Sequence, residues 1–147
     1  MKKIVLTGFL LMFVSLLAFA DEDLKRFKEL KINDEVVYLD LDTNLMWQEK
    51  PLERVDFITA RNFCKASNYA GFLDWRLPKI KELKAIVNIA LTKVVTELPY
   101  TPPREFWSST EEFLFPQYIE VLDFANGFVR GHWYQFSYET YGRCVRP

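Results

Sequence analysis

The sequence contains a single histidine, His132, and only two cysteines, Cys64 and Cys144. One histidine excludes a multi-histidine metal site and a two-histidine iron triad. A cysteine–histidine nucleophilic pair would need Cys64 or Cys144 to remain a free thiol. The sequence therefore favours a protein without catalytic residues, metal or cofactor, rather than an enzyme.

The chain also lacks an excess of basic charge. It holds 19 basic and 20 acidic residues, a net charge of −1, and without the first 20 residues the net charge falls to −3. Nucleic acids and anionic membranes are bound through basic patches. The composition therefore argues against both as partners.

A long apolar run occurs only at the start of the chain. Two lysines precede the run at residues 4–19, and Ala18 and Ala20 place small residues at the two positions that a signal peptidase reads. This pattern predicts that residues 1–20 are a secretory signal peptide, cleaved after Ala20. The alternative is an uncleaved anchor, but the run is shorter than the roughly 20 residues that span a membrane. We expect a periplasmic or secreted protein whose mature chain has no transmembrane segment.

Export makes a disulfide credible, because disulfides form and persist outside the cytoplasm. The only intramolecular pairing is Cys64 with Cys144. It would close a loop of about 80 residues and stabilise the fold by roughly 4–5 kcal/mol on the chain-entropy model. The alternative is two buried free thiols.

The pattern along the mature chain predicts early helices and late strands, which is an α+β arrangement. Residues 21–34 form a charged lead-in segment, in which Leu24, Phe27 and Leu30 lie three residues apart. This spacing predicts a short amphipathic helix or a partly ordered stretch. One folded domain is then expected over residues 35–147, a usual length for a single core.

Helix and strand signals follow one another within this domain. Apolar residues at helical spacing predict helices over residues 56–67 and 80–91. Turn residues Asp42-Thr43-Asn44 and Asn126-Gly127 predict hairpins, and three prolines predict a loop at residues 96–105. The expected strands are residues 35–41, 45–47, 106–109, 118–124, 129–136 and 142–146.

Five short motifs occur in a fixed order around the helix that carries Cys64. They are Asp42-Thr43-Asn44-Leu45-Met46-Trp47, Asp74-Trp75-Arg76-Leu77-Pro78, Trp107-Ser108-Ser109-Thr110, Asp123-Phe124 and Arg143-Cys144-Val145-Arg146. This series resembles the Lcl C-terminal domain family, first described as a bacterial domain of unknown function. The resemblance covers roughly residues 36–147.

The resemblance implies a C-type-lectin-like fold, related to formylglycine-generating enzymes, with two helices packed on small antiparallel sheets and long loops. It also implies a bridge between Cys64 in the first helix and Cys144 in the last strand. The best-known member of the family is a surface adhesin that binds sulfated glycans and oligomerises. A binding role is therefore the expectation that the family brings.

The sequence departs from the family pattern at two structural positions. Asn44 stands where the family has glycine, and asparagine can still adopt a positive φ. Lys79 stands where the family has a helix-capping threonine, a loss of about 1 kcal/mol. The several histidines of sulfoxide synthases, the late cysteine pair of formylglycine-generating enzymes and the calcium-binding tripeptides of true lectins are all absent.

Several motif residues have side chains that bind ligands in other proteins. Trp47, Trp75 and Trp107 are expected in the core, since a tryptophan in such a motif more often buries its ring than stacks on sugar. Asp74 and Arg76 are expected to bond their surroundings. The candidate ligand-binding residues are Trp107, Arg130, His132, Trp133 and Tyr134. Most of them lie near a hairpin outside the motifs, where binding residues are common, and the alternative is a strand with one wet face.

We therefore expect an exported, non-catalytic binding module of the bacterial envelope that recognises a glycan or an envelope protein. One alternative is a formylglycine-generating type of enzyme that uses Cys144. Another is a structural subunit that assembles through aromatic side chains.

Overall fold

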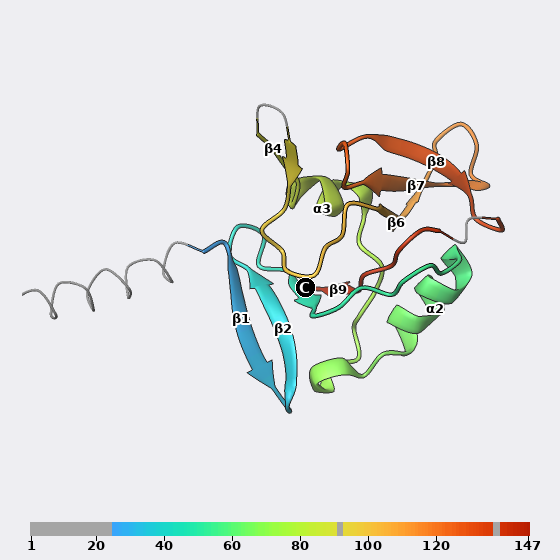
Figure 1. The fold of residues 1–147 in the computed structure, drawn as a ribbon. Coiled ribbons are helices and arrows are strands. Elements are labelled where there is room, and N and C mark those ends of the chain that lie inside the picture. The colour runs from blue at the N-terminus through green and yellow to red at the C-terminus, as the bar shows by residue number, and fades with distance from the viewer. Residues whose placement is uncertain (1–24, 91–92, 137–138) are drawn as a thin grey trace, which may run out of the picture.

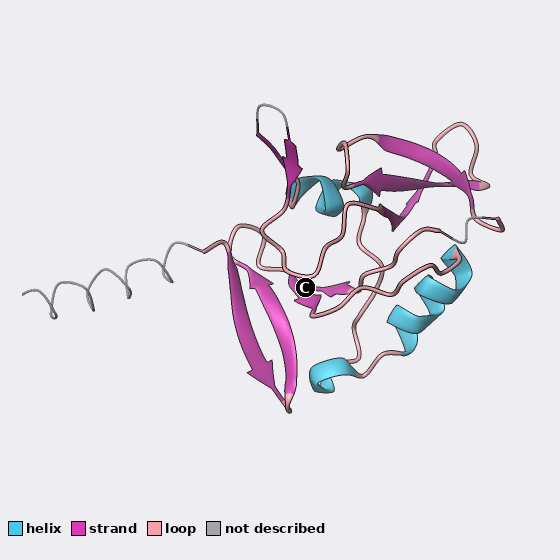
Figure 2. Ribbon diagram, viewed as in Figure 1, coloured by secondary structure: helices cyan, strands magenta, loops and turns pink. Residues whose placement is uncertain are grey.

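The computed structural model describes residues 25–90, 93–136 and 139–147, so the predicted signal peptide lies outside the described residues. Two α-helices combine with short strands, which confirms the α+β class (Figure 2). The elements are β1 (Phe27–Ile32), β2 (Glu35–Asp40), β3 (Met46–Gln48), α2 (Phe57–Ala66), the 3-10 turn η1 (Tyr69–Gly71), α3 (Ile80–Ala85), β4 (Asn88–Ala90), β5 (Lys93–Val95), β6 (Glu105–Glu111), β7 (Tyr118–Asp123), β8 (Val129–Trp133) and β9 (Val145–Arg146). Within the described ranges, no helix is long and apolar enough to cross a membrane.

The strands of the described residues form three antiparallel sheets, in the orders β1-β2-β3-β9, β4-β5 and β6-β7-β8. Figure 1 shows the β1–β2 hairpin at one end of the molecule and the β6–β7–β8 sheet at the other, with β9 between them. The strand β9 is paired with β3, where Met46 faces Arg146 and Trp47 faces Val145. A late segment of the chain therefore completes a sheet that an early segment begins.

The predicted disulfide is present. The sulfur atoms of Cys64 and Cys144 are 2.05 Å apart, and their Cα atoms are 5.4 Å apart. The bond joins α2 to the residue that precedes β9. Both cysteines are buried, so the bridge lies inside the core rather than on its surface.

The three motif tryptophans are core residues, as predicted. Trp47, Trp75 and Trp107 are each at most 2% exposed. The indole of Trp75 donates to the carbonyl of Tyr69 at 2.9 Å, and that of Trp107 donates to the carbonyl of Val55 at 2.8 Å. These bonds fix the rings against the loops on either side of α2.

The predicted first helix and the predicted turn of the first hairpin are both present. Asp56 caps α2, because its carboxylate accepts from the backbone N–H of Thr59 at 2.9 Å. Asn44 adopts a φ of 58° in the β2–β3 turn, the left-handed conformation that asparagine tolerates. Local side-chain chemistry is thus enough to set both positions.

The cap that Lys79 cannot supply to α3 comes from a distant strand. The hydroxyl of Thr110, on β6, accepts from the backbone N–H of Ile80 at 3.0 Å. The Glu82 carboxylate accepts from the backbone N–H of Lys79 at 2.7 Å and binds Arg76. Two of the free N–H groups at this helix start are therefore satisfied without a threonine at position 79.

Two predicted helical segments are wrong in part. Residues 27–32 form strand β1 instead of a helix, because each of them pairs with a residue of β2. The second helix ends at Ala85 rather than Leu91, since residues 88–90 pair with β5. Leu91 itself lies outside the described residues. In both cases pairing with a partner strand overrides the local apolar spacing.

Two of the late strands are shorter than expected, whereas β6 extends beyond the predicted residues 106–109 at both ends. The strand predicted over residues 129–136 ends at Trp133, where the N–H of Phe136 turns back to the carbonyl of Trp133 at 3.2 Å. In the segment 142–146 only Val145 and Arg146 are strand β9. The predicted Asn126-Gly127 turn does join β7 to β8, with Gly127 at a φ of 77°.

The buried carboxylate of Asp40 holds the end of β2 in place, and its ionisation predicts how stability changes at acid pH. Asp40 accepts two 2.7 Å bonds from Arg26 and a third 2.7 Å bond from the hydroxyl of Thr43. Burial opposes ionisation of Asp40, but these donors outweigh it and hold its pKa below the ordinary value. Its contribution to stability is therefore full above the unfolded-state pKa, about 3.9, and is lost as the pH falls through the lower folded pKa.

We expect Asp40→Asn to lower the free energy of unfolding by about 2 kcal/mol at neutral pH, because Arg26 loses its charged partner. The loss should shrink as the pH falls from about 4 through the lower folded pKa, because Asp40 is protonated first in the unfolded chain and then in the native protein. Urea denaturation of both proteins at neutral and acid pH measures the difference. The exposed Asp34→Asn is the control, and equal losses at both pH values would contradict the assignment.

Candidate functional site

The most unusual side chain of the interior is Arg143, a guanidinium that is 1% exposed. Burial lowers its pKa to about 9, so the group remains charged at neutral pH. Its bonds run to backbone carbonyls and a hydroxyl, and the salt bridges of the described residues do not include it. A charge buried in this way is kept only where its N–H groups are well used.

The bonds of Arg143 join two segments that are far apart in sequence. On one side it donates to the carbonyls of Gln48 at 3.0 Å and Glu49 at 2.5 Å. On the other it donates to the carbonyl of Pro99 and the hydroxyl of Thr101, both at 2.8 Å. The planar fork of arginine fits several acceptors at once, so one side chain fixes the spacing of two loops.

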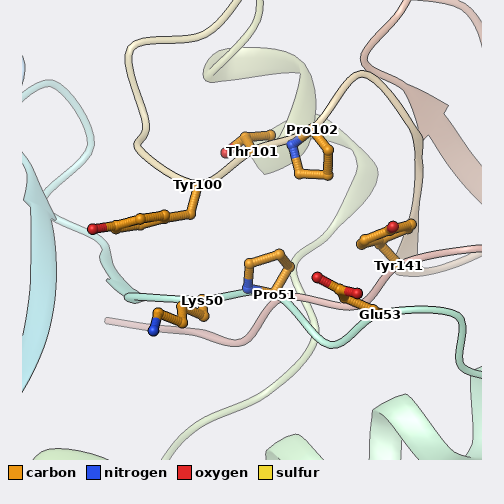
Figure 3. Close-up of a pocket in the computed structure, with 7 residues that line it drawn as sticks. All are labelled: Lys50, Pro51, Glu53, Tyr100, Thr101, Pro102 and Tyr141. Carbon is orange, nitrogen blue, oxygen red and sulfur yellow. The ribbon is translucent and has the colours of Figure 1, made fainter.

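These two loops enclose an open hollow on the surface, with a volume of about 510 Å³ (Figure 3). We call it the Tyr100–Tyr141 hollow, and it is lined by Lys50, Pro51, Glu53, Tyr100, Thr101, Pro102 and Tyr141. Figure 3 shows the two tyrosine rings on opposite sides, with Pro51 and Pro102 between them. The volume is in the range of small-molecule sites, about 300–1,000 Å³.

The backbone of the hollow carries strain at one of its aromatic residues. Tyr100 has a φ of 56°, which is uncommon for a residue with a bulky side chain. Its ring is 56% exposed, and the ammonium of Lys50 lies 5.9 Å from its centre. Tyr141 is held from behind by the ring of Phe106, at 5.6 Å. The ring of Tyr141 therefore packs against the core, whereas Tyr100 is largely exposed.

The side chains that line the hollow are of types that can contact a ligand. Its lining residues carry two phenol groups, one ammonium and one carboxylate, with proline and tyrosine rings between them. Both cysteines of the chain are in the disulfide, and no cluster of three metal-ligating side chains occurs among the residues that the structure describes. The groups present can donate to, accept from and stack on a ligand.

The residues that the sequence singled out are not brought to one surface. Trp107 is fully buried, so its ring offers no face to a ligand. Arg130 and His132 lie on one face of β8, where the Glu105 carboxylate is 3.3 Å from Arg130 and 3.1 Å from His132. Trp133 lies on the opposite face, because side chains alternate along a strand.

Trp133 and Tyr134 also lie in different environments. The ring of Trp133 is 45% exposed and lies 6.1 Å from that of Tyr118. Tyr134 is partly buried against the core cluster that surrounds the disulfide. Asp74 and Arg76 are bonded within the fold, to Arg146 and Glu82 respectively, as the sequence suggested.

Sequence reasoning missed the hollow, although one signal pointed towards it. Its lining comes from residues 50–53, from the proline-rich loop and from Tyr141, which no local pattern connects. The useful signal was the motif Arg143-Cys144-Val145-Arg146. Arg143, which precedes the buried Cys144, is itself buried, and its hydrogen bonds reach both loops that line the hollow.

Comparison with known proteins agrees with the motif order. The model of the Lcl C-terminal domain family matches residues 36–146, a range that contains the hollow, Arg143 and both cysteines. No curated protein and no solved structure matches the chain. Because the match extends over most of the sequence, the chain belongs to the Lcl C-terminal domain family.

Proposed function

We propose that this protein is an exported, non-catalytic binding module of the bacterial envelope, and that the Tyr100–Tyr141 hollow holds a glycan. The observation that carries the proposal is the pair of tyrosine rings on opposite sides of one open hollow. Sugar rings have apolar faces that stack on aromatic side chains and hydroxyls that bond polar groups around them. The C-type-lectin-like character that the family implies is part of the same proposal.

The polar groups of the hollow suit a ligand rich in hydroxyls. The ammonium of Lys50 donates, the carboxylate of Glu53 accepts, and the phenol groups of Tyr100 and Tyr141 do both. Their separation around apolar surface is the usual composition of a ligand pocket. Arg143 adds preorganisation, because both loops are tied to it before a ligand arrives.

The catalytic alternative is disfavoured by the chemistry of its nucleophile. A formylglycine-generating type of reaction would need a thiol at Cys144, and this sulfur is bonded to Cys64. The bond is buried and joins two elements of the core. Thiol labelling of the native protein, with and without reductant, tests this point directly, and labelling without reductant would favour the enzyme.

We expect Tyr100→Asn to weaken glycan binding by about tenfold or more, a loss of about 1.4 kcal/mol. Asparagine tolerates the positive φ of this position, so the loop keeps its shape while the ring is removed. A glycan array identifies the ligand of the wild-type protein, and titration calorimetry with that glycan measures the loss.

The matched control is Phe128→Asn, an exposed aromatic residue on the β7–β8 turn, which should bind as wild type does. Unchanged binding by Tyr100→Asn would show that the glycan does not bind in the hollow. A glycan array without signal, together with a protein captured from the envelope fraction, would indicate that the ligand is a protein and not a glycan.

A further inference from the structure

The connection between β6 and β7 presents three consecutive apolar side chains to solvent. Phe113 is 95% exposed, Leu114 74% and Phe115 52%, and we call these three residues the apolar tip. Figure 1 shows this connection as a loop at the outer edge of the β6–β7–β8 sheet. Contiguous exposed apolar surface of this kind marks an interaction site.

The apolar tip is held in this arrangement by its own backbone. The N–H of Glu112 donates to the carbonyl of Tyr118, and the N–H of Tyr118 donates to the carbonyl of Phe115, both at 2.8 Å. These bonds close the loop across its base. The exposure of the three side chains is therefore a property of an ordered turn.

Behind the apolar tip lies a row of aromatic rings. The ring centres are 6.3 Å apart from Phe115 to Tyr118, 6.1 Å from Tyr118 to Trp133 and 5.5 Å from Trp133 to Phe136. Trp133 is 45% exposed and Phe136 66% exposed. Tryptophan and tyrosine favour the boundary between hydrocarbon and water, because each combines an apolar ring with a polar group.

The charges around the apolar tip limit what can cover it. Glu111 ends β6 and Glu112 begins the loop, and the mature chain is expected to carry a net charge of −3. Anionic headgroups would be repelled by these carboxylates. Two copies meeting tip to tip would bring four carboxylates together, which also opposes self-association.

The area argues in the same direction. The tip, Trp133 and Phe136 offer roughly 600–700 Å² if each large side chain presents about 200 Å² when fully exposed. Binding to a membrane scales with the apolar area that is inserted, so an apolar surface of this size suits reversible insertion.

We propose that the apolar tip inserts into the interface of a lipid membrane with zwitterionic headgroups, and that the aromatic row rests at the headgroup level. The tip supplies the inserted apolar groups, while Tyr118 and Trp133 supply the interfacial ones. This site shares no residue with the Tyr100–Tyr141 hollow, so its test does not depend on the glycan.

The protein contains its own reporter for this site. Trp47, Trp75 and Trp107 are buried at 0–2% exposure, whereas Trp133 is 45% exposed and adjoins the tip through Tyr118 and Phe115. Binding to phosphatidylcholine vesicles should shift the tryptophan emission to shorter wavelength, and brominated phosphatidylcholine should quench it. The variant Trp133→Phe should co-sediment with vesicles and show neither change.

The deciding variant is the double substitution Phe113→Ser and Leu114→Ser. We expect its partition onto phosphatidylcholine vesicles to fall by about tenfold or more, since most of the inserted area is removed. Phe128→Ser, which is 65% exposed before substitution and lies on the β7–β8 turn, should partition as wild type does. All proteins carry the same N-terminal segment, so any contribution from that segment cancels.

Three results would overturn the proposal. The first is no co-sedimentation of the wild-type protein with phosphatidylcholine vesicles. The second is equal partition of the wild-type protein and the double variant. The third is a dimer in light scattering that the double variant loses, which would make the occupant a second copy of this chain.

Discussion

Replacing Arg143 by methionine is expected to lower the free energy of unfolding by about 3–5 kcal/mol. Methionine fills much of the volume but donates no hydrogen bond. The carbonyls of Gln48, Glu49 and Pro99 and the hydroxyl of Thr101 would lose their donor at once. A buried acceptor without a donor costs about 1–3 kcal/mol, which is more than the bond itself contributes. Urea denaturation followed by circular dichroism measures the loss.

Two further variants separate the fork of Arg143 from its charge. Arg143→Lys keeps the charge, but one ammonium cannot reach acceptors on both loops, so we expect nearly the same loss. Arg130→Met removes an arginine that is 53% exposed and should change stability by no more than about 0.5 kcal/mol. Full recovery of stability by the lysine variant would show that the charge, and not the geometry of the fork, matters.

Loss of the Cys64–Cys144 disulfide is expected to cost a similar amount. The two residues are 80 positions apart, and release of such a loop adds about 4–5 kcal/mol of entropy to the unfolded state on the chain-entropy model. Replacing both cysteines by alanine should therefore move the midpoint of urea unfolding to a much lower concentration.

Reduction provides the matched comparison for this variant. Reductant should shift the wild-type midpoint towards that of the double alanine variant, while the variant itself should not respond. Retention of the wild-type midpoint by the variant would show that the packing of α2 and β9 holds the core without the bridge. A steeper or shallower transition would indicate instead a change in the compactness of the unfolded chain.

Features that depend on local chemistry could be predicted from the sequence. Asp56 starts α2, Asn44 makes the turn after β2, and Gly127 makes the turn after β7. In each case one residue type has the conformation or the side-chain oxygen that the position requires. The pairing of Cys64 with Cys144 could also be predicted, because two cysteines leave no other choice.

Features that depend on a distant part of the chain could not be predicted from the sequence. The three-residue spacing of Phe27 and Leu30 fits one face of a helix and places them on opposite faces of a strand. Pairing with β2 nevertheless makes this segment a strand. The apolar stripe that predicted a longer α3 includes Ile86 and Val87, which lie between the helix and β4. Pairing of β4 with β5 ends the helix at this point.

The candidate site could not be predicted from the sequence for the same reason, because it depends on contacts between distant segments. Its walls come from segments about 50 residues apart, and the side chain that sets their distance lies roughly 40 residues further on. The late hairpin looked more promising, since it gathers a cation, an imidazole and aromatic rings within a few residues. Alternation along β8 then places Arg130 and Trp133 on opposite faces.

The pairing of β3 with β9 also has a consequence for the rate of folding. Met46 and Arg146 are opposite one another although 100 residues separate them, so the first sheet cannot close until the last strand arrives. Folding rates fall as contacting residues become more distant along the chain. For the exported protein that we propose, slow closure would keep the chain extended for long enough to be translocated. In that case the disulfide would form only after passage, when Cys144 reaches Cys64.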